Sequence, residues 1–273
     1  MERIGIYGGT FNPPHIGHIE AAKQAVEALQ LTKLLVIPDR IAPHKIMPGN
    51  SAAPQQRLDM LRIALEGCEK IEVSDIELNR EGPSYTFETI LELKKTYPDA
   101  QLVLLMGTDM FLSFHTWKHP EIILQNASLG VFCRGEKGEK KSIEAKKAEM
   151  EAQGAKIEVV KNDVINISST QMRRLLAFRC AGEFLPEGVL DYIRENRLYD
   201  TRAPWKNLPM DQLEEIVIRL LNPNRIAHVL GCRDTAVELA KHWGADMTDA
   251  ARAGILHDIT KAIDGPLQLT LCE

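Results

Sequence analysis

The stretch Ile4-Gly5-Ile6-Tyr7-Gly8-Gly9-Thr10-Phe11-Asn12-Pro13-Pro14-His15-Ile16-Gly17-His18 decides the fold of this chain. Its short apolar run at residues 4–7 predicts a β-strand, and a helical pattern starts near residue 16. The order is therefore strand, glycine-rich turn and helix N-terminus, which is the backbone geometry that binds phosphate groups. Glycine lets the backbone pass close to a ligand because it has no Cβ. The stretch thus predicts an α/β protein with an anion site after its first strand.

Two histidines begin the helix that follows this turn. His15 and His18 are three residues apart, so they share one face of a helix. Imidazoles beside a helix N-terminus can donate hydrogen bonds to a triphosphate and to the charge that builds up when a phosphoryl bond breaks. Such a pair can also be solvated or structural, and many α/β folds use a glycine-rich turn for packing alone. The complete run Gly8–His18 is far more specific than either part.

Strand and helix patterns alternate after this first unit, which predicts a doubly wound parallel sheet with helices on both faces. The continuously apolar run Val103–Met106 is typical of a central strand that is buried on both sides. The predicted strands are Arg3–Tyr7, Lys33–Pro38, Ile71–Ser74, Gln101–Gly107, Leu129–Arg134 and Lys156–Val160. The predicted helices are Ile16–Leu29, Pro54–Glu66, Thr86–Thr96, Ser142–Gln153 and, after the capping run Ser168–Thr170, Gln171–Ala177.

Ligands of such sheets gather at the carboxyl ends of the strands. The Gly8 loop, the loop Pro38–Lys45 and the segment Gly107–Asp109 each follow a predicted strand at that edge. We therefore expect these three segments to converge on one crevice.

The pattern changes near residue 200. Residues Asp200–Pro209 contain two prolines and indicate a linker, and the strand pattern stops after it. The remainder is helical throughout, with predicted helices at Asp211–Leu221, Arg225–Trp243 and Thr248–Lys261. We predict two domains, an α/β domain at residues 1–200 and a smaller all-α segment at residues 201–273.

The composition bounds the class of protein. A net charge of −5 over 273 residues gives no electrostatic reason to expect nucleic-acid binding. Five widely spaced cysteines without a C-x-x-C pair fit reduced thiols in a cytoplasm better than disulfides or a zinc ribbon. The chain shows neither a leader pattern nor an apolar run near 18 residues, so we expect a cytoplasmic protein without a membrane partner.

The run Gly8–His18 resembles the signature of the nucleotidyltransferase superfamily, and within it that of bacterial nicotinate-nucleotide adenylyltransferases. Three later segments resemble further elements of this family in the expected order. Pro43–Lys45 is similar to its P-P-H-K element, with Ala42 in place of the first proline, and Gly107–Asp109 followed by Trp117 is similar to its G-x-D…W element. Ile167–Arg173 is similar to its I-S-S-T-x-x-R element.

The resemblance implies a Rossmann-like fold and the transfer of AMP from ATP to nicotinate mononucleotide, with Mg²⁺ carried on the ATP phosphates. It implies four residues that act on the phosphates during transfer: His15, His18, Lys45 and Arg173. It implies a set that binds ATP: Gly8, Gly9, Thr10, Phe11, Asp109, Ile167, Ser169 and Thr170. Some of these have plainer alternatives, because Asp109, Ser169 and Thr170 could be helix caps only, and Lys45 could be a surface lysine.

The same resemblance implies the acceptor site. Trp117 is similar to the family's residue that stacks on the nicotinate ring, although it could also be a half-buried core indole. Tyr85 and Thr86 belong to a segment similar to the family's S-Y-T element, whose backbone amides meet the carboxylate at a helix start. Lys45 is expected to pair with phosphate oxygens of the nucleotide as a mobile charge.

The C-terminal segment resembles a different family. Arg225–His228 and His257–Lys261 are similar to the start of an HD-type phosphohydrolase domain, most closely the hydrolases that split symmetrical dinucleoside polyphosphates. The resemblance implies a divalent transition metal held by His228, His257 and Asp258. Such domains need a further aspartate on later helices, and only Asp264 follows, so we expect an incomplete metal site.

Two alternatives to adenylyl transfer alone stay open at this point. The C-terminal segment could hydrolyse dinucleoside polyphosphates, or its helices could simply pack and serve as a homo-oligomerisation surface. The second alternative predicts exposed apolar faces around Leu213–Leu221.

Overall fold

The computed structural model describes residues 2–43, 47–133, 138–160, 163, 165, 167–178, 181–201 and 208–262. The chain separates into two compact units. The first comprises residues 1–169 and 182–192, and the second comprises residues 170–181 and 193–273. The division into domains at residue 200 stays a prediction.

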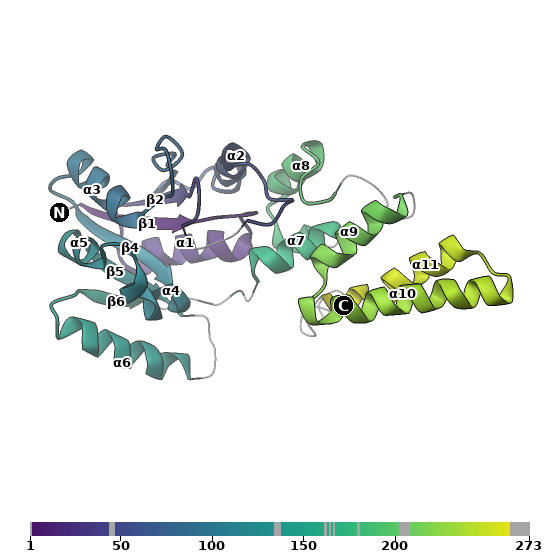
Figure 1. The fold of residues 1–273 in the computed structure, drawn as a ribbon. Coiled ribbons are helices and arrows are strands. Elements are labelled where there is room, and N and C mark those ends of the chain that lie inside the picture. Colours follow the sequence, from purple (N-terminus) through teal and green to yellow (C-terminus); the bar gives the residue numbers. More distant parts are fainter. Residues whose placement is uncertain are drawn as a thin grey trace. The chain divides into compact units, whose positions relative to one another are not determined.

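The first unit is built on a six-stranded sheet (Figure 1). Every neighbouring pair of strands is parallel, and the spatial order is β3-β2-β1-β4-β5-β6. The strands are β1 (Arg3–Gly9), β2 (Lys33–Pro38), β3 (Ile71–Val73), β4 (Gln101–Gly107), β5 (Ala127–Phe132) and β6 (Ile157–Val160). The predicted α/β class with a doubly wound, Rossmann-like parallel sheet is confirmed. The strand order reverses between β1 and β4, which is where such sheets bind ligands.

Helices cover both faces of this sheet. They are α1 (Ile16–Ala28), α2 (Pro54–Ala64), α3 (Thr86–Thr96), α4 (Thr108–Leu112), α5 (Pro120–Asn126) and α6 (Glu139–Glu151), with a 3-10 turn at η1 (Phe114–Thr116). The 3-10 turn η2 (Gly182–Phe184) and helix α8 (Glu187–Glu195) follow later in the chain, and Gly188 of α8 lies against Ile63 of α2. The helix predicted from Ser142 begins at Glu139, because the Glu139 side chain turns inward and is only 7% exposed. Helices α4, α5 and α8 were not predicted.

The core lies on the two faces of β4. Leu102, Leu104 and Met106 pack in one apolar cluster, and Val103 and Leu105 pack in the other. The first cluster also contains buried residues of α3, α5 and α6, and the second contains buried residues of α1 and α2. The central strand is therefore buried on both sides, as its continuous apolar run predicted.

The second unit is helical in its described part. It contains most of α7 (Ser169–Ala177) together with α9 (Met210–Leu220), α10 (Pro223–Trp243), α11 (Met247–Leu256) and the 3-10 turn η4 (Ile259–Ala262). The side chains of Asn222 and Asp246 cap the first turns of α10 and α11, and Gly244 ends α10 with a left-handed φ of 72°.

These helices bury an apolar cluster of their own. Leu213, Val217 and Val229 pack with Ile255, and Ala177 of α7 joins the same cluster. Leu213 and Val217 are fully buried. The expectation of exposed apolar faces around Leu213–Leu221 is therefore wrong, because α7, α10 and α11 supply the cover that the sequence pattern did not reveal.

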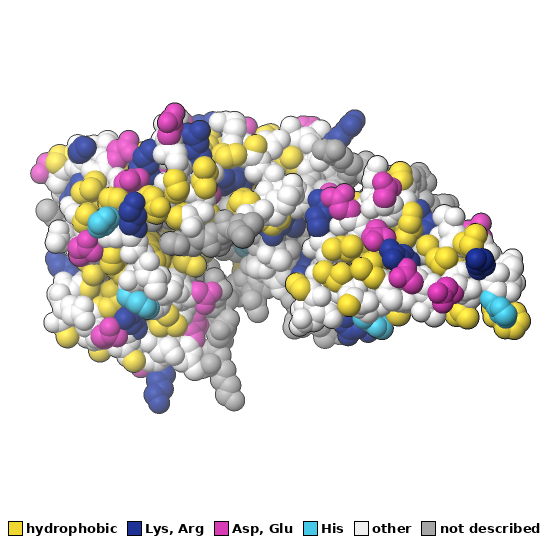
Figure 2. Space-filling view, in the orientation of Figure 1, with side chains coloured by type: hydrophobic (Ala, Val, Ile, Leu, Met, Phe, Trp, Pro, Cys, Tyr) yellow, Lys and Arg dark blue, Asp and Glu magenta, His cyan; other side chains and the backbone are white. Residues whose placement is uncertain are grey.

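Among the described residues of this unit, the exposed large apolar side chains are Leu239, Trp243 and Met247, near the α10–α11 turn. On the face in Figure 2, Lys and Arg side chains intermingle with Asp and Glu side chains over both units. Within the described ranges, no helix combines the length and the apolar character that crossing a bilayer requires.

Candidate active site

The glycine-rich turn joins β1 to α1 at the carboxyl edge of the sheet. Gly9 pairs with Pro38 at the end of β2, and Asp39 N–H donates to Gly9 O at 3.0 Å. In the described structure, no heavy atom outside its chain neighbours lies within 4 Å of where Gly8 would carry a Cβ. A Cβ on Gly17 would instead lie 3.1 Å from Nδ1 of the His15 ring. The turn thus presents bare backbone at Gly8 and packs closely at Gly17.

His15 and His18 stack against each other at the start of α1. Their ring centroids are 3.7 Å apart with an interplanar angle of 30°, and Phe11 packs edge-on against His18 at 5.1 Å. His15 N–H donates to Nδ1 of His18 at 3.3 Å. A nitrogen that accepts carries no proton, so the proton of a neutral His18 ring lies on Nε2.

The His15 ring is buried to 3% exposure, and neither of its ring nitrogens has a hydrogen-bond partner within the described residues. Burial disfavours the charged form and lowers the pKa of His15 from 6.5 to about 4. A neutral imidazole is therefore held here at physiological pH. Its desolvated nitrogens gain most from a ligand that supplies the missing partner.

A buried network of ionic hydrogen bonds stabilises this turn. Arg57 of α2 is 1% exposed, and its guanidinium donates to Thr10 O at 2.7 Å, Asp39 O at 2.7 Å and Asp39 Oδ1 at 3.1 Å. Thr10 Oγ1 donates to the other carboxylate oxygen of Asp39 at 2.7 Å. The planar fork of arginine thus joins the loops that follow β1 and β2.

Two further contacts fix the rest of the turn. Asn12 donates to Ser51 Oγ at 2.9 Å and accepts from Ala52 N–H at 3.2 Å. Ser169 Oγ donates to Pro13 O at 3.1 Å. The structure therefore brings Ser169 to the glycine-rich turn, although 156 positions separate it from Pro13.

The segment expected to bind the nicotinate carboxylate begins α3. Tyr85 is the N-cap residue of α3 and Thr86 is its first residue. Ser84 is buried, and its hydroxyl accepts from Arg40 N–H at 2.9 Å. The loop after β2 and the start of α3 are therefore joined at the carboxyl edge of the sheet.

The residues around Trp117 lie against this segment. Trp117 is half-buried and packs on Phe114 with ring centroids 5.4 Å apart. The next residue, Lys118, places Nζ 4.0 Å from the centroid of the Tyr85 ring. The structure thus brings the two predicted acceptor segments together, and Lys118 is a cation there that sequence reasoning missed.

Asp109 lies exposed in the first turn of α4, directly after β4, and Gly107 takes the N-cap position. The helix-cap alternative for Asp109 is therefore wrong. The preceding Thr108 is buried, and its hydroxyl hydrogen-bonds to Phe132 O at 3.1 Å and to the Glu139 carboxylate. Glu139 thereby ties α6 to the start of α4.

Lys45 lies outside the described residues. Thr170 and Arg173 belong to the second unit, where Arg173 Nη2 lies 3.2 Å from Thr170 Oγ1. Burial lowers the pKa of Arg173 from its ordinary value.

The C-terminal residues predicted to hold a metal do meet. Nε2 of His228 on α10 lies 3.4 Å from Nε2 of His257, which follows α11. Asp258 Oδ2 lies 3.7 Å from the former nitrogen and 3.9 Å from the latter. Sequence reasoning missed Cys232, whose Sγ lies 3.7 Å from His228 Nε2. Its signal was its place one helical turn after His228.

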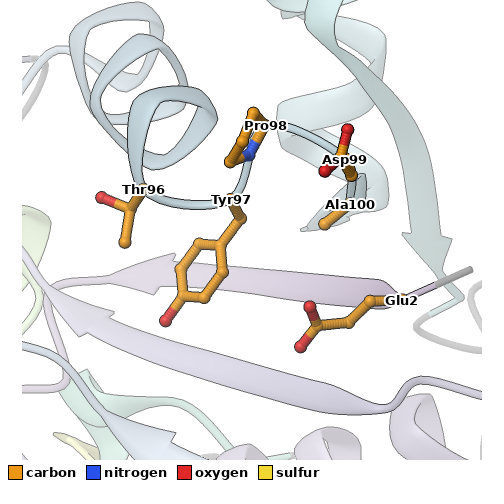
Figure 3. Close-up of a pocket in the computed structure, with 6 residues that line it drawn as sticks. All are labelled: Glu2, Thr96, Tyr97, Pro98, Asp99 and Ala100. Atoms are coloured by element: carbon orange, nitrogen blue, oxygen red, sulfur yellow. The ribbon is translucent and has the colours of Figure 1, made fainter.

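A shallow pocket elsewhere on the first unit does not belong to this site. It is lined by Glu2 and residues 96–100 (Figure 3). These residues come just before β1 and β4, so the pocket lies at the amino ends of the strands. The predicted phosphate turn lies at the opposite edge of the sheet.

Comparisons with known proteins agree with this geometry. A family model described as cytidylyltransferase-like matches residues 6–175. A "Probable nicotinate-nucleotide adenylyltransferase" of Exiguobacterium sibiricum is 38% identical over 200 residues, which cover 73% of this chain and 100% of that protein. Its counterpart of the same description in Neisseria meningitidis serogroup C is 32% identical over 206 residues, again covering 73% of this chain and 100% of the relative.

A solved structure shares the fold. The nicotinic acid mononucleotide adenylyltransferase of Plasmodium falciparum, complexed with NaAD, superposes with a TM-score of 0.60. The superposition covers 74% of this chain and 99% of that one at 19% sequence identity.

Proposed function

This chain belongs to the nicotinate-nucleotide adenylyltransferase family, and from that premise we propose how its residues carry out the reaction. The enzyme transfers AMP from ATP to nicotinate mononucleotide, giving deamido-NAD and pyrophosphate in NAD biosynthesis. A phosphate oxygen of the mononucleotide attacks the α-phosphorus of ATP and forms a new P–O bond. The bond from the α-phosphorus to the bridging oxygen breaks, and pyrophosphate leaves with that oxygen.

The observation that carries the proposal is the buried His15 ring, which has two unpartnered nitrogens in the described structure and stacks on His18. We propose that the neutral imidazoles donate hydrogen bonds to the triphosphate, from Nε2 in the case of His18. These hydrogen bonds become stronger as negative charge moves onto the leaving pyrophosphate. His15 is neutral at physiological pH, so it can donate a hydrogen bond to a phosphate without gaining or losing a proton. This neutral state supports the proposed role.

The other phosphate contacts follow the sequence order. The open space where Gly8 would carry a Cβ supports an approach of phosphate to its backbone, and we propose that Gly9 and Thr10 extend this contact, with Phe11 packed against Gly9 and His18. Ser169 begins α7 and contacts the same turn, which supports a phosphate role for the amides at the start of that helix. We propose that Ile167 and Thr170 flank these amides and that Lys45 and Arg173 add positive charge.

ATP brings its own cation in this proposal. Asp39 lies beside the turn, and its carboxylate oxygens accept hydrogen bonds from Arg57 and Thr10. These hydrogen bonds stabilise the loop. Mg²⁺ bound to the ATP phosphates would neutralise charge on the leaving pyrophosphate. Asp109, exposed beside the end of β4, is proposed to accept from the ribose hydroxyls.

The acceptor site is proposed to lie between α3 and the segment after η1. Trp117 would stack on the pyridine ring, and the amides at Tyr85 and Thr86 would donate to its carboxylate at the positive end of α3. The contact between Lys118 and the Tyr85 ring supports this placement, because it sets a cation beside the same helix start.

The experiment is pyrophosphate release from Mg·ATP with three acceptors compared at equal concentration. These are nicotinate mononucleotide, nicotinamide mononucleotide and phosphopantetheine. We expect a strong preference for the nicotinate compound. Equal or greater turnover with another acceptor would retain adenylyl transfer and refute the proposed carboxylate site.

The C-terminal helices carry a second candidate function, because His228, His257 and Asp258 lie within 3.9 Å of one another through their ligand atoms. We propose that they bind a divalent transition metal in the manner of the HD-type hydrolases. The corresponding activity is hydrolysis of a symmetrical dinucleoside tetraphosphate. It is tested with added Mn²⁺ in the parent chain and in His257→Ala, and equal rates in both would reject it.

A further inference from the structure

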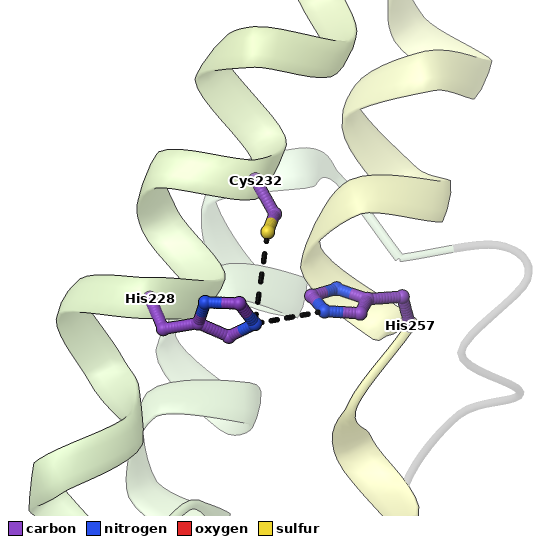
Figure 4. A group of neighbouring side chains, drawn as sticks. All are labelled: His228, Cys232 and His257. Atoms are coloured by element: carbon purple, nitrogen blue, oxygen red, sulfur yellow. Dashed lines mark hydrogen bonds between the residues drawn. The ribbon is translucent and has the colours of Figure 1, made fainter.

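We infer that Cys232 is a ligand of the C-terminal cation site, which makes it a thiolate and bis-imidazole site for a zinc-class cation. The inference rests on the metal site proposed above and changes its ligand set. The donor atoms of His228, Cys232 and His257 all lie within 4.8 Å of one another (Figure 4). Two of them come from one face of α10, and the third comes from the residue that follows α11.

Two of the three donor separations fit a tetrahedral cation. Zinc bonds of about 2.0–2.1 Å to nitrogen and 2.3 Å to sulfur imply about 3.3 Å between two nitrogen ligands and about 3.6 Å between nitrogen and sulfur. The corresponding separations here are 3.4 Å between the two histidine Nε2 atoms and 3.7 Å from Cys232 Sγ to His228 Nε2. Two of the three separations therefore already match one ion, and the third, between the donor atoms of Cys232 and His257, is within 4.8 Å.

The His257 ring is already oriented for coordination. Its Nδ1 lies 2.7 Å from Gly254 O, and a carbonyl oxygen can only accept, so Nδ1 carries the proton. The lone pair is therefore on Nε2, which points at His228 in Figure 4. A backbone carbonyl that fixes the tautomer of a histidine is a usual outer partner of metal-binding imidazoles.

Asp258 has a different set of partners. Its Oδ2 forms an ion pair with Arg225 Nη1 at 2.6 Å, and its Oδ1 forms an ion pair with Lys261 Nζ at 2.9 Å. Both carboxylate oxygens are thus in ion pairs, and the residue is 5% exposed. We assign Asp258 to the support of the site and Cys232 to its third ligand position.

The donor set selects the class of cation. One thiolate and two imidazoles are borderline-soft ligands, which favour Zn²⁺ over the oxygen-seeking Mg²⁺ and Ca²⁺. A groove along α10 is lined by His228, Cys232 and Thr235, among others. The remaining coordination position can therefore take water or a small anion from solvent.

Cobalt substitution tests the inference, since tetrahedral Co²⁺ absorbs in the visible and a thiolate ligand adds a sulfur-to-cobalt band in the near ultraviolet. The full chain is treated with a chelator, dialysed and titrated with CoCl₂ and, in competition, with ZnCl₂. We expect one Co²⁺ per chain, a near-ultraviolet sulfur band, and displacement by stoichiometric Zn²⁺ that a large excess of Mg²⁺ does not reproduce.

Three variants separate the ligand sets, with far-ultraviolet circular dichroism to check folding. Cys232→Ser should lose the sulfur band and bind cobalt at least tenfold more weakly, whereas Asp258→Asn should keep the band. Cys68→Ser, a partly exposed thiol on the first unit, is the matched control and should change nothing.

Cobalt binding without a sulfur band, or a band that survives in Cys232→Ser, would overturn the assignment. If binding is lost in Asp258→Asn but not in Cys232→Ser, the carboxylate set proposed above is right and this inference is wrong. Absence of binding in the parent chain would reject both. Pyrophosphate release is measured in parallel, so failure of adenylyl transfer is a separate outcome.

Discussion

The titration of His15 tests the active-site reasoning most directly. Burial lowers the pKa of His15 to about 4, whereas a histidine in an unfolded chain titrates near about 6.5. Between these values the native protein binds fewer protons than the unfolded chain. Its free energy of unfolding is therefore highest above about pH 6.5 and decreases as the pH falls toward 4. Each unit of pKa difference corresponds to about 1.4 kcal/mol, so this ring alone removes about 2.5 kcal/mol between pH 7.5 and pH 4.5.

The perturbation is His15→Asn, which removes the titrating ring. Urea unfolding of parent and variant is measured at both pH values, and the parent should lose about 2.5 kcal/mol more than the variant on acidification. His119→Asn is the matched control, because the His119 side chain is 49% exposed and asparagine tolerates its left-handed φ of 52°. The control should behave like the parent.

Nuclear magnetic resonance gives a second readout on the same ring. The His15 ring proton, assigned by its loss in His15→Asn, should titrate near pH 4 in the free protein. Bound Mg·ATP should raise this pKa, since an anion beside the ring favours the charged imidazole. Equal acid losses in parent and variant, together with a ring pKa near 6.5, would refute the claim that His15 is desolvated and unpartnered.

Three further outcomes follow from the site. Arg57→Met leaves Asp39 buried without its cation, so the free energy of unfolding, measured by urea denaturation, should fall by about 3–5 kcal/mol. The control Arg62→Met, on the exposed face of α2, should change it by less than about 0.5 kcal/mol. His18→Ala should reduce turnover about 10²-fold or more with the fold intact by circular dichroism, and unchanged turnover would remove its role. Trp117→Ala should raise the KM for nicotinate mononucleotide far more than the KM for ATP, and equal increases would reject stacking.

The strands could be predicted because parallel strands buried on both faces leave continuous apolar runs. The bounds predicted for β2, α3 and β4 agree with the structure at every residue. Helices α4 and α5 were missed because they have five and seven residues, too few for an apolar period to appear. α6 begins three residues early because Glu139 enters the interior to bind Thr108, a tertiary contact that no local pattern records.

The phosphate turn could be predicted from the sequence because its glycines, prolines and histidines lie in one continuous run. Arg57 could not, since a buried arginine is rare and its partners, Thr10 and Asp39, are 47 and 18 positions away. The wide spacing of the cysteines favours an ordinary reduced thiol at Cys232. Only the packing of α10 against α11 brings it to His257 and makes it a candidate ligand.

The packing of α7 bears on how this protein can be divided. The family match at residues 6–175 ends inside α7, yet Ala177 at the end of that helix is buried with residues of α9, α10 and α11. The chain also passes between the two units at residues 169, 181 and 192. A recombinant chain cut after residue 200 would keep α7 and lose the side chains of α9, α10 and α11 that pack on Ala177. The end of the family match and the border between the two packed units therefore fall at different residues.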